Sequence, residues 1–218
     1  MKTAAYFDVD GTLTATTSVT PLLWYRHRRG TIADHVWAVS IPFRAPWWLL
    51  RYRLNNAAGN RTIYRNYRGF NAVRAQQDAH AFLEECLKPR LHPPIVDRLN
   101  VLKRDGVKIV LITGGLDFIL RPLADYLEAE LIAPGLVESG GTFTGVLTRA
   151  PLTGHAKFEE VRAHAQRNGI DLSASHAFGN EHGDAEMLQA VGHPVAVHPD
   201  RRLKKIALQH RWEIVEKC

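Results

Sequence analysis

Two carboxylates stand close to the start of the chain, in the segment Asp8-Val9-Asp10-Gly11-Thr12. The apolar residues before them predict a short buried strand that ends on the first carboxylate. A spacing of two at a strand end leaves one carboxylate pointing into the crevice beyond the sheet and lets the chain bend so that the other follows. Such a pair can hold a hard divalent cation, or one carboxylate can attack phosphorus while the other exchanges protons.

Three further features fall at the ends of later strands or the start of a helix. Thr113-Gly114-Gly115 follows KIVLI, where a hydroxyl and glycine-exposed N–H groups ahead of a helix make an anion site. Lys157 lies near the start of a later helix and offers a mobile cation suited to phosphate charge. The segment 179–184 (GNEHGD) follows another strand, and its oxygen side chains could complete a metal shell.

Each feature taken alone has an ordinary structural explanation. The acidic pair could be a turn with solvated carboxylates, and Thr113-Gly114-Gly115 could be a plain strand-to-helix turn. Lys157 could be a solvated surface lysine, and 179–184 could be a loop that ends in a helix cap at Asp184. The four features together, in this order and at strand ends, favour a functional site, because open α/β sheets place their ligands there.

The elements that would position these residues alternate between strand and helix. The sequence predicts strands over 4–8, 108–112, 131–133, 174–178 and 195–197. It predicts helices over 93–105, 116–127 and 155–168, two more that begin near 184 and 201, and a hairpin through 142–147 that turns at Gly140-Gly141. This alternation predicts an α/β fold with a Rossmann-like parallel sheet and helices on both faces.

The stretch from about residue 18 to 91 differs from the rest. It is helical in pattern, rich in Arg, Trp and Tyr, and contains no convincing strand. We therefore interpret it as an insertion after the first strand. The length of 218 residues and an apolar fraction of 45% fit one α/β domain that carries a small insertion.

The formal charge of +6 is concentrated in this first third of the chain, where Arg26-His27-Arg28-Arg29 form a cluster and more arginines follow. No nucleic-acid-binding module is recognisable, so we expect no nucleic-acid partner. The N-terminus has no apolar signal core, and Cys86 and Cys218 lack metal-type or redox-type spacing. We expect a cytoplasmic protein with reduced thiols.

The segments FDVDGTLT, LITGG, GHAK and GNEHGDAEML resemble, in this order, the four motifs of the haloacid dehalogenase-like (HAD) hydrolases. The resemblance is closest to the phosphoserine-phosphatase-like branch (subfamily IB) and covers nearly the whole chain. It implies a Mg²⁺-dependent phosphomonoester phosphatase that works through an aspartyl-phosphate. It also implies a HAD-like core domain of residues 1–15 and 92–218, with a helical cap domain of residues 16–91 that covers the site and selects the substrate.

The resemblance implies catalytic roles for three residues. Asp8 would attack phosphorus and form the aspartyl-phosphate. Asp10 would protonate the leaving oxygen and then deprotonate the hydrolytic water. Lys157 would neutralise both Asp8 and the phosphoryl group, because a carboxylate and a phosphate dianion repel each other.

The resemblance also implies the binding residues. The hydroxyl of Thr113 and the N–H of Gly114 would hold phosphate oxygens, together with Lys157. The Mg²⁺ ligands would be Asp8, the backbone carbonyl of Asp10, Asn180 and Asp184.

The fourth motif departs from the branch, which usually has Gly-Asp-Ser or Gly-Asp-Gly where this chain has Gly179-Asn180-Glu181. An Asn carbonyl oxygen can ligate Mg²⁺ but adds no negative charge. We therefore predict a functional but weaker metal site. The alternative is a catalytically weakened phosphate-binding or regulatory protein.

Two substrate classes stay open, a small phosphorylated metabolite and a lipid phosphate. The insertion carries the apolar runs VWAVSIPF and APWWLL, edged by Arg44, Arg51 and Arg53 and too short for the roughly 20 residues of a bilayer span. Trp and Arg beside short apolar helices suit a membrane interface, which would make the cap a peripheral membrane contact. Alternatively, these aromatic residues pack a small core of the cap and the arginines are solvated.

Overall fold

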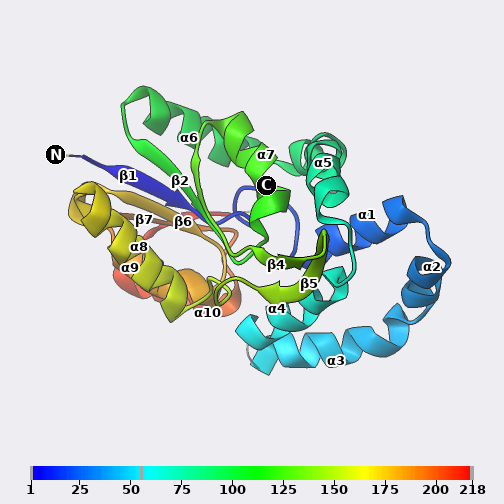
Figure 1. Cartoon of the computed structure of the whole chain (residues 1–218). Helices are drawn as coiled ribbons and strands as arrows, with labels where there is room; N and C mark the ends of the chain where they lie inside the picture. The colour runs from blue at the N-terminus through cyan, green and yellow to red at the C-terminus, as the bar shows by residue number, and fades with distance from the viewer. Residues whose placement is uncertain (1, 55, 217–218) are drawn as a thin grey trace.

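Six strands form one parallel sheet in the part of the chain that the computed structural model describes, residues 2–54 and 56–216. Their order is β3-β2-β1-β6-β7-β8, and every neighbouring pair is parallel (Figure 1). The strands are β1 (Ala4–Phe7), β2 (Lys108–Ile112), β3 (Glu130–Ile132), β6 (His176–Gly179), β7 (His193–Val197) and β8 (Glu213–Val215). The predicted α/β fold with a Rossmann-like parallel sheet is confirmed.

Only the backbone of residues 48, 49, 51–54, 56–58 and 60 is described. The predictions made for the side chains of Trp48, Leu49, Arg51 and Arg53, and those for Cys218, therefore lie outside the described part of the chain.

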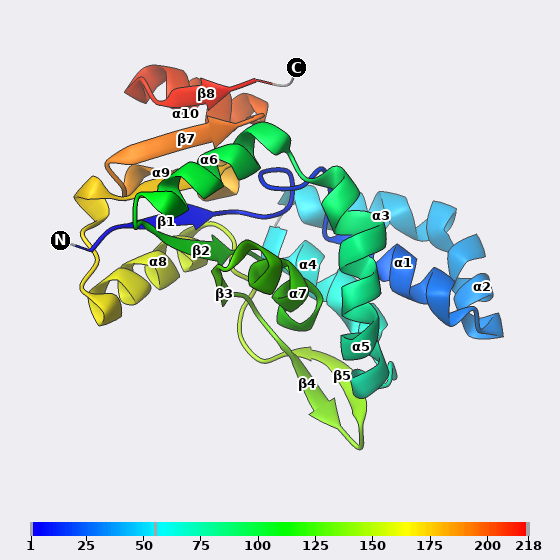
Figure 2. The same cartoon turned by 90° about the horizontal axis from the view of Figure 1, so that it is seen from above.

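Side chains of the central strands alternate between two hydrophobic clusters, one on each face of the sheet. Ala5 and Phe7 of β1 belong to one cluster, and Ala4 and Tyr6 belong to the other. The first cluster is covered by α6 (Pro93–Arg104) and α7 (Asp117–Leu127); the second is covered by α8 (His155–Asn168), α9 (Ala185–Gln189) and α10 (Arg201–His210) (Figure 2). Burial on both faces explains the apolar run of β2, in which only Lys108 is exposed.

Local chemistry sets the ends of the core helices. Two prolines begin α6. Proline lacks an N–H group, which costs no hydrogen bond here because N–H groups in the first turn of a helix have no acceptor within the helix. Gly169 ends α8 in the left-handed region, with φ of 64°. The Asp200 side chain caps α10 by accepting a hydrogen bond from the N–H of Leu203 at 2.7 Å.

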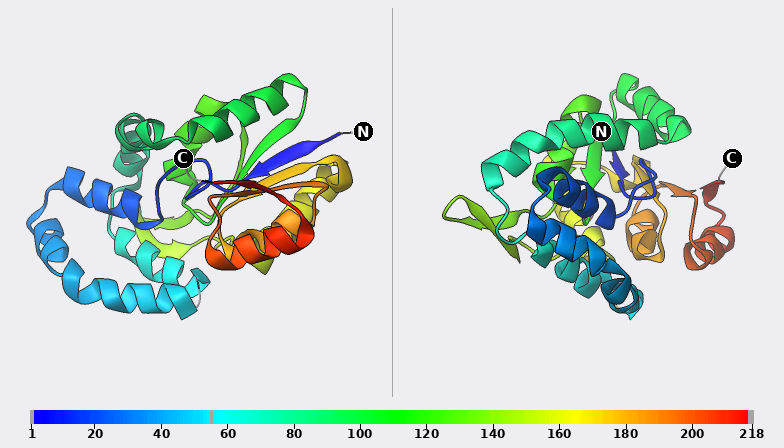
Figure 3. Two further views of the ribbon diagram at one scale, coloured as in Figure 1. Left: turned by 180° about the vertical axis from the view of Figure 1, so that it is seen from behind. Right: turned by 90° about the vertical axis from the view of Figure 1, so that its right-hand side faces the viewer.

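A helical insertion follows β1, as predicted. It comprises α1 (Val19–Arg29), α2 (Ile32–Val39), α3 (Ile41–Leu54) and α4 (Asn56–Tyr64); after it come η1 (Arg65–Tyr67), α5 (Ala72–Phe82), η2 (Leu83–Leu87) and η3 (Lys88–Arg90). Helices α1–α4 project beyond the carboxyl end of the sheet, whereas α5 packs along α7 (Figures 2 and 3). Among the described residues, none of the helices combines the length and apolar character that a bilayer span requires.

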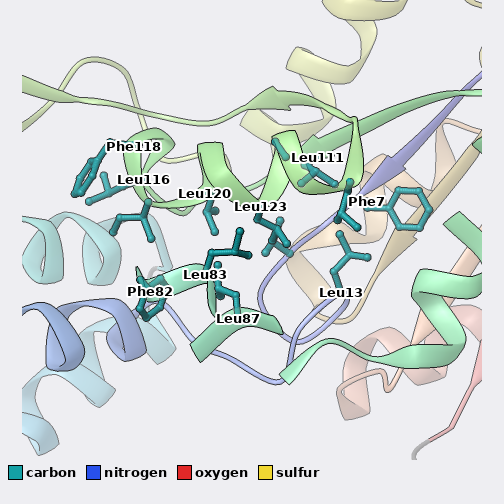
Figure 4. Packing of buried hydrophobic residues seen from close by; sticks show 14 of the residues in the cluster. Phe7, Leu13, Phe82, Leu83, Leu87, Leu111, Leu116, Phe118, Leu120 and Leu123 are labelled. Carbon is teal, nitrogen blue, oxygen red and sulfur yellow. The ribbon is translucent and has the colours of Figure 1, made fainter. Parts of the chain in front are cut away.

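One continuous hydrophobic cluster joins the sheet to the helices that follow the insertion. Leu83 and Leu87 of η2 lie beside Leu120 and Leu123 of α7, and the cluster continues to Phe7 of β1 (Figure 4). Inner aromatic residues of the insertion and of η1 belong to the same cluster: Tyr25, Trp37 and Tyr64 of the insertion, and Tyr67 of η1. The insertion is therefore anchored to the core through buried aromatic rings.

The remaining elements sit close to the carboxyl edge or connect the later strands. The predicted hairpin is formed by β4 (Leu136–Ser139) and β5 (Thr142–Leu147), which are antiparallel around Gly140-Gly141. The strand predicted over 174–178 begins two residues later, because the 3₁₀ turn η4 (Leu172–Ala174) is capped by Asp171. A second 3₁₀ turn, η5 (His182–Asp184), precedes α9.

Candidate active site

All seven residues selected from the sequence line one small cavity of about 50 Å³ at the carboxyl edge of the sheet. They come from the loops that follow β1, β2 and β6 and from the first turn of α8: Asp8, Asp10, Thr113, Gly114, Lys157, Asn180 and Asp184. Positions as far apart in the chain as 8 and 184 meet because the strands are parallel and adjacent in the sheet.

The ammonium group of Lys157 lies between two carboxylates. Its Nζ atom donates to Asp8 Oδ1 at 2.7 Å and to Asp184 Oδ1 at 2.6 Å. All three side chains are buried, Lys157 with only 3% of its surface exposed. The alternative of a solvated surface lysine is therefore wrong, and Lys157 is the cation at the centre of the site.

Burial governs the ionisation of this cluster. Burial raises the pKa of Asp8 to about 7, and the attraction of Lys157 only partly opposes it. Burial also raises the pKa of Asp10. For Lys157, burial alone would lower the pKa, but Asp184 and Asp8 outweigh it and raise the pKa, so the amine stays charged. Among the described residues that line the cavity, one ammonium thus faces two buried carboxyl groups, Asp8 and Asp184, and the half-buried Asp10, so carboxyl groups outnumber cations.

Two threonines that the sequence interpretation did not select orient the acidic pair. Thr12 Oγ1 donates to Asp8 Oδ2 at 3.2 Å, and Thr16 Oγ1 donates to Asp10 Oδ1 at 2.7 Å. Both threonines are buried. Thr12 stands inside the quoted motif FDVDGTLT, so its position was visible in the sequence, whereas the contact of Thr16 depends on how the chain turns after β1.

The loop after β2 has the geometry of an anion site. Thr113 is 1% exposed, and its Oγ1 accepts a hydrogen bond from the N–H of Gly115 at 3.0 Å. The loop leads directly into the N-terminus of α7, which adds partial positive charge. Tyr64, at the end of α4, donates its hydroxyl to the Gly114 carbonyl at 2.6 Å. Burial raises the pKa of Tyr64, so this hydroxyl stays protonated and ties the insertion to the loop.

The loop after β6 wraps around Asp184. Asp184 Oδ2 accepts hydrogen bonds from the N–H groups of Asn180 and Glu181 at 3.0 and 3.1 Å. A Cβ atom on Gly179 would lie 2.6 Å from Asp184 Cβ, so only glycine allows this approach. Likewise, Gly11 has φ of 84° and faces the Asn180 amide.

The Asn180 side chain identifies a point where oxygen atoms converge. With its nitrogen turned inward, the amide donates to Asp8 Oδ2 at 3.2 Å and to the Asp10 carbonyl at 3.1 Å. With its oxygen turned inward, the amide accepts a hydrogen bond from Thr12 Oγ1 at 3.1 Å and its oxygen faces Asp8 Oδ2 and the Asp10 carbonyl, so a bound cation would favour this orientation. Among the described residues, no group of three or more His, Cys, Asp or Glu side chains is placed to hold a metal. The candidate set instead mixes carboxylate, amide and carbonyl oxygens, which suit Mg²⁺, and the excess of carboxyl groups agrees with a divalent cation.

Comparisons with known proteins agree with this geometry. The family described as haloacid dehalogenase-like hydrolase matches residues 5–189. The chain is 28% identical to "Phosphoserine phosphatase SerB1" of Mycobacterium tuberculosis, over 98% of this chain and 70% of the relative. It is 27% identical to "Inhibition of morphological differentiation protein" of Streptomyces azureus, over 68% of this chain and about half (54%) of that protein.

Solved structures share the fold. A protein of unknown function from Bordetella pertussis superposes with a TM-score of 0.85 at 22% identity, covering 99% of both chains. A substrate-bound phosphoserine phosphatase superposes with a TM-score of 0.71 at 18% identity, covering 100% of this chain and 94% of the other. The chain belongs to the haloacid dehalogenase-like hydrolases, and its sequence and structural neighbours lie in the phosphoserine-phosphatase-like branch.

Proposed function

We propose that the protein hydrolyses phosphomonoesters through an aspartyl-phosphate on Asp8. The observation that carries the proposal is the Lys157 ammonium, which bonds Asp8 and Asp184 in the same cavity as Asp10, Thr113 and Gly114. A buried cation beside a carboxylate lowers the repulsion between that carboxylate and a phosphate dianion.

The proposed reaction has two displacements at phosphorus. In the first, an Asp8 carboxylate oxygen attacks phosphorus, the bond to the leaving oxygen breaks, and Asp10 gives that oxygen a proton. In the second, Asp10 takes a proton from water, the water oxygen attacks phosphorus, and the bond to Asp8 breaks to release inorganic phosphate. The Thr113 hydroxyl and the Gly114 N–H donate to phosphate oxygens as charge spreads over them.

A magnesium ion belongs to this proposal. Asp8, the Asp10 carbonyl, Asn180 and Asp184 would hold it. When bound, Mg²⁺ would neutralise negative charge on the phosphoryl oxygens. We further propose that residues 16–91 form a cap domain, which agrees with the position of α1–α4 beyond the carboxyl edge and with the contact from Tyr64 to Gly114.

The decisive experiment compares phosphate release from a generic aryl phosphate by wild type and Asp8→Asn, with Mg²⁺ and with EDTA. We expect metal-dependent turnover in the wild type and a loss of at least about 10⁴-fold in the variant. A circular dichroism melt shows whether the variant is folded. Equal turnover by both proteins would remove Asp8 as the nucleophile.

A phosphate-binding or regulatory role is the second candidate, and Asn180 is the observation that favours it. In one orientation its amide hydrogen-bonds the oxygens proposed to bind the metal. If the folded wild type binds inorganic phosphate in a calorimeter but turns over no phosphomonoester with Mg²⁺, this second role replaces hydrolysis.

We also propose that the cap contacts a membrane surface. Val36, Val39, Phe43 and Trp47 are more than half exposed on α2 and α3, and large exposed apolar side chains of this kind suit a lipid interface. Co-sedimentation with anionic vesicles at low salt should occur for wild type and weaken for Phe43→Ser. Equal binding by the two proteins would contradict a contact through α3.

A further inference from the structure

A second and much larger cavity adjoins the proposed catalytic cavity. Its volume is about 980 Å³, and it lies between the helical insertion and the loops at the carboxyl edge of the sheet. Four residues line both cavities: Asp10, Ser18, Asn180 and Glu181. The large cavity therefore lies directly beside the catalytic one, and its volume falls in the range of roughly 300–1,000 Å³ that is typical of small-molecule sites.

The insertion gives this cavity an apolar wall. The residues that form it come from α1, α3 and α4: Val19, Leu23, Ile41, Ala45, Pro46 and Ile63. Although the insertion is rich in arginine, no Arg or Lys of the described residues lines the cavity. Among the described residues, a second anionic group of a substrate would therefore meet only His92 and His198 as groups able to carry a positive charge, whereas an apolar group would leave water for the apolar wall.

The position of Asp10 decides which part of a substrate would enter the cavity. Asp10 is the proposed acid for the leaving oxygen, and it stands at the junction of the two cavities. Lys157, Thr113 and Gly114 line only the small cavity, where the phosphoryl group would sit. The leaving alcohol must then extend past Asp10 into the large cavity.

We propose that the physiological substrate is a phosphomonoester whose alcohol carries a long apolar chain, and that this chain occupies the cavity between α1, α3 and α4. This inference rests on the proposed phosphatase function and specifies its substrate class. Helix α3 supports it from outside. Ile41, Ala45 and Pro46 line the cavity while Phe43 and Trp47 are exposed, so this helix is apolar on two faces, as expected where water is scarce.

The test measures kcat/KM for alkyl phosphates from ethyl to octyl, each below the concentration at which it forms micelles. Burial of each methylene should raise kcat/KM by about 2- to 4-fold, so the octyl-to-ethyl ratio should reach at least ~60. Ala45→Phe places a ring in the apolar part of the cavity, where the alkyl chain would bind, and should reduce this ratio to below about 5. Ala38→Phe introduces the same side chain at an exposed position of α2 that does not line the cavity, and should leave the ratio unchanged.

A second variant guards against a folding defect in the first. Leu23→Gln makes the α1 part of the same wall polar, at a position that is already 42% exposed, and should also lower the octyl-to-ethyl ratio. A wild-type ratio near 1, or a ratio that Ala45→Phe and Leu23→Gln leave at the wild-type value, would overturn the proposal.

Failure of the substrate proposal is distinguishable from failure of the phosphatase proposal. Turnover of ethyl and octyl phosphate at equal kcat/KM overturns only the apolar chain site. If neither is hydrolysed, calorimetry with octyl and ethyl phosphate still tests the cavity: tighter binding of octyl phosphate that Ala45→Phe abolishes supports it, and equal affinity overturns it.

The apolar phosphomonoester could come from solution or from a lipid bilayer. Phosphatidic acid in vesicles, assayed beside monomeric octyl phosphate, distinguishes the two sources. In either arm, the loss caused by Ala45→Phe identifies the cavity as the site of the chain.

Discussion

The carboxyl edge of the sheet and the helical insertion differ in which side chains they bury and which they expose. At the edge, charged side chains are buried and each is held by named partners; Asp8, Lys157 and Asp184 are at most 6% exposed. In the insertion, large apolar side chains face outward, and Val39 and Phe43 are 75% and 84% exposed. Buried, hydrogen-bonded charges at the edge are held in one arrangement, as a catalytic site requires. The exposed apolar surface of the insertion is instead available to bind a partner or a substrate.

Several arginines of the insertion form ion pairs within the protein. Arg26 and Arg29 pair with Asp34 at 2.9 and 3.4 Å, and Arg28 pairs with Asp78 at 3.0 Å. Arg26 also lies 4.4 Å from the centroid of the Trp37 ring. The arginines of this basic cluster are therefore paired with acidic residues of the insertion and of α5. The expected internal packing of aromatic residues holds for Trp37, whereas Trp47 is 57% exposed.

The largest effect should follow from removing the buried cation at the edge. Lys157→Met leaves Asp8 and Asp184 without their shared donor. We expect phosphatase activity to fall by ~10³-fold or more, and the free energy of unfolding to fall by about 3 kcal/mol. Phosphate release and urea unfolding measure the two effects.

The matched control is Lys205→Met on α10, where the lysine is exposed. It should change neither quantity by a measurable amount. If Lys157→Met kept wild-type activity, the neutralising role of Lys157 would be excluded.

Two phenylalanines, one in the sheet and one in the insertion, allow the contribution of packing to stability to be compared between the two regions. Phe7 of β1 is fully buried and stacks on Phe178, with ring centroids 4.3 Å apart, whereas Phe43 of α3 is exposed. Phe7→Ala should lower the free energy of unfolding by about 3–5 kcal/mol, and Phe43→Ala by less than about 0.5 kcal/mol. Urea unfolding measures both. A large loss from Phe43→Ala would mean that the outer face of α3 is covered by another part of the protein.

The sheet was predictable because its signals are local and strong. KIVLI predicted β2 at its observed bounds, and the helix over 155–168 was predicted residue for residue. The short strand β8 (Glu213–Val215) was missed, because three residues that are only half-buried or exposed carry no periodicity. Its place is set by pairing with β7, a tertiary contact.

The candidate site was predictable in membership but not in its contacts. Motif order was enough to bring the seven residues to one cavity. The burial of Lys157, the donation from Thr16 to Asp10 and the contact of Tyr64 with Gly114 depend on how distant segments meet. The apolar cavity was likewise invisible, because its wall combines residues from three helices of the insertion.

A smaller effect should come from changing the unusual amide at the edge. Asn180→Asp removes an amide that donates to Asp8 Oδ2 and the Asp10 carbonyl in one orientation, and adds negative charge to the carboxylate cluster. Without Mg²⁺ the free energy of unfolding should fall by about 1–3 kcal/mol. With Mg²⁺ the added charge should tighten metal binding, so Mg²⁺ should raise Tm more in the variant than in the wild type.

Thermal melts in EDTA measure the stability without Mg²⁺, and melts across a Mg²⁺ titration measure the rise in Tm. Asn100→Asp, the same substitution on the exposed face of α6, is the control. Equal Mg²⁺ dependence in wild type and Asn180→Asp would argue that residue 180 is not a metal ligand.

The smallest effect concerns the opposite end of the sheet, where the strands begin. His176 and His193 pair across β6 and β7, with stacked rings 4.6 Å apart. Burial, and then the proximity of His193, lower the pKa of His176 below its ordinary value. At this residue the unfolded chain therefore binds a proton more readily than the folded one. The contribution of His176 to the free energy of unfolding should fall as pH drops below about 6.5 and level off below the lowered pKa, whereas the raised pKa of Asp8 contributes with the opposite sign. His176→Gln should flatten this dependence in urea unfolding between pH 7.5 and 5, whereas His35→Gln in the exposed surface of α2 should leave it as in the wild type. An unchanged slope in His176→Gln would mean that His176 does not contribute to the pH dependence of folding.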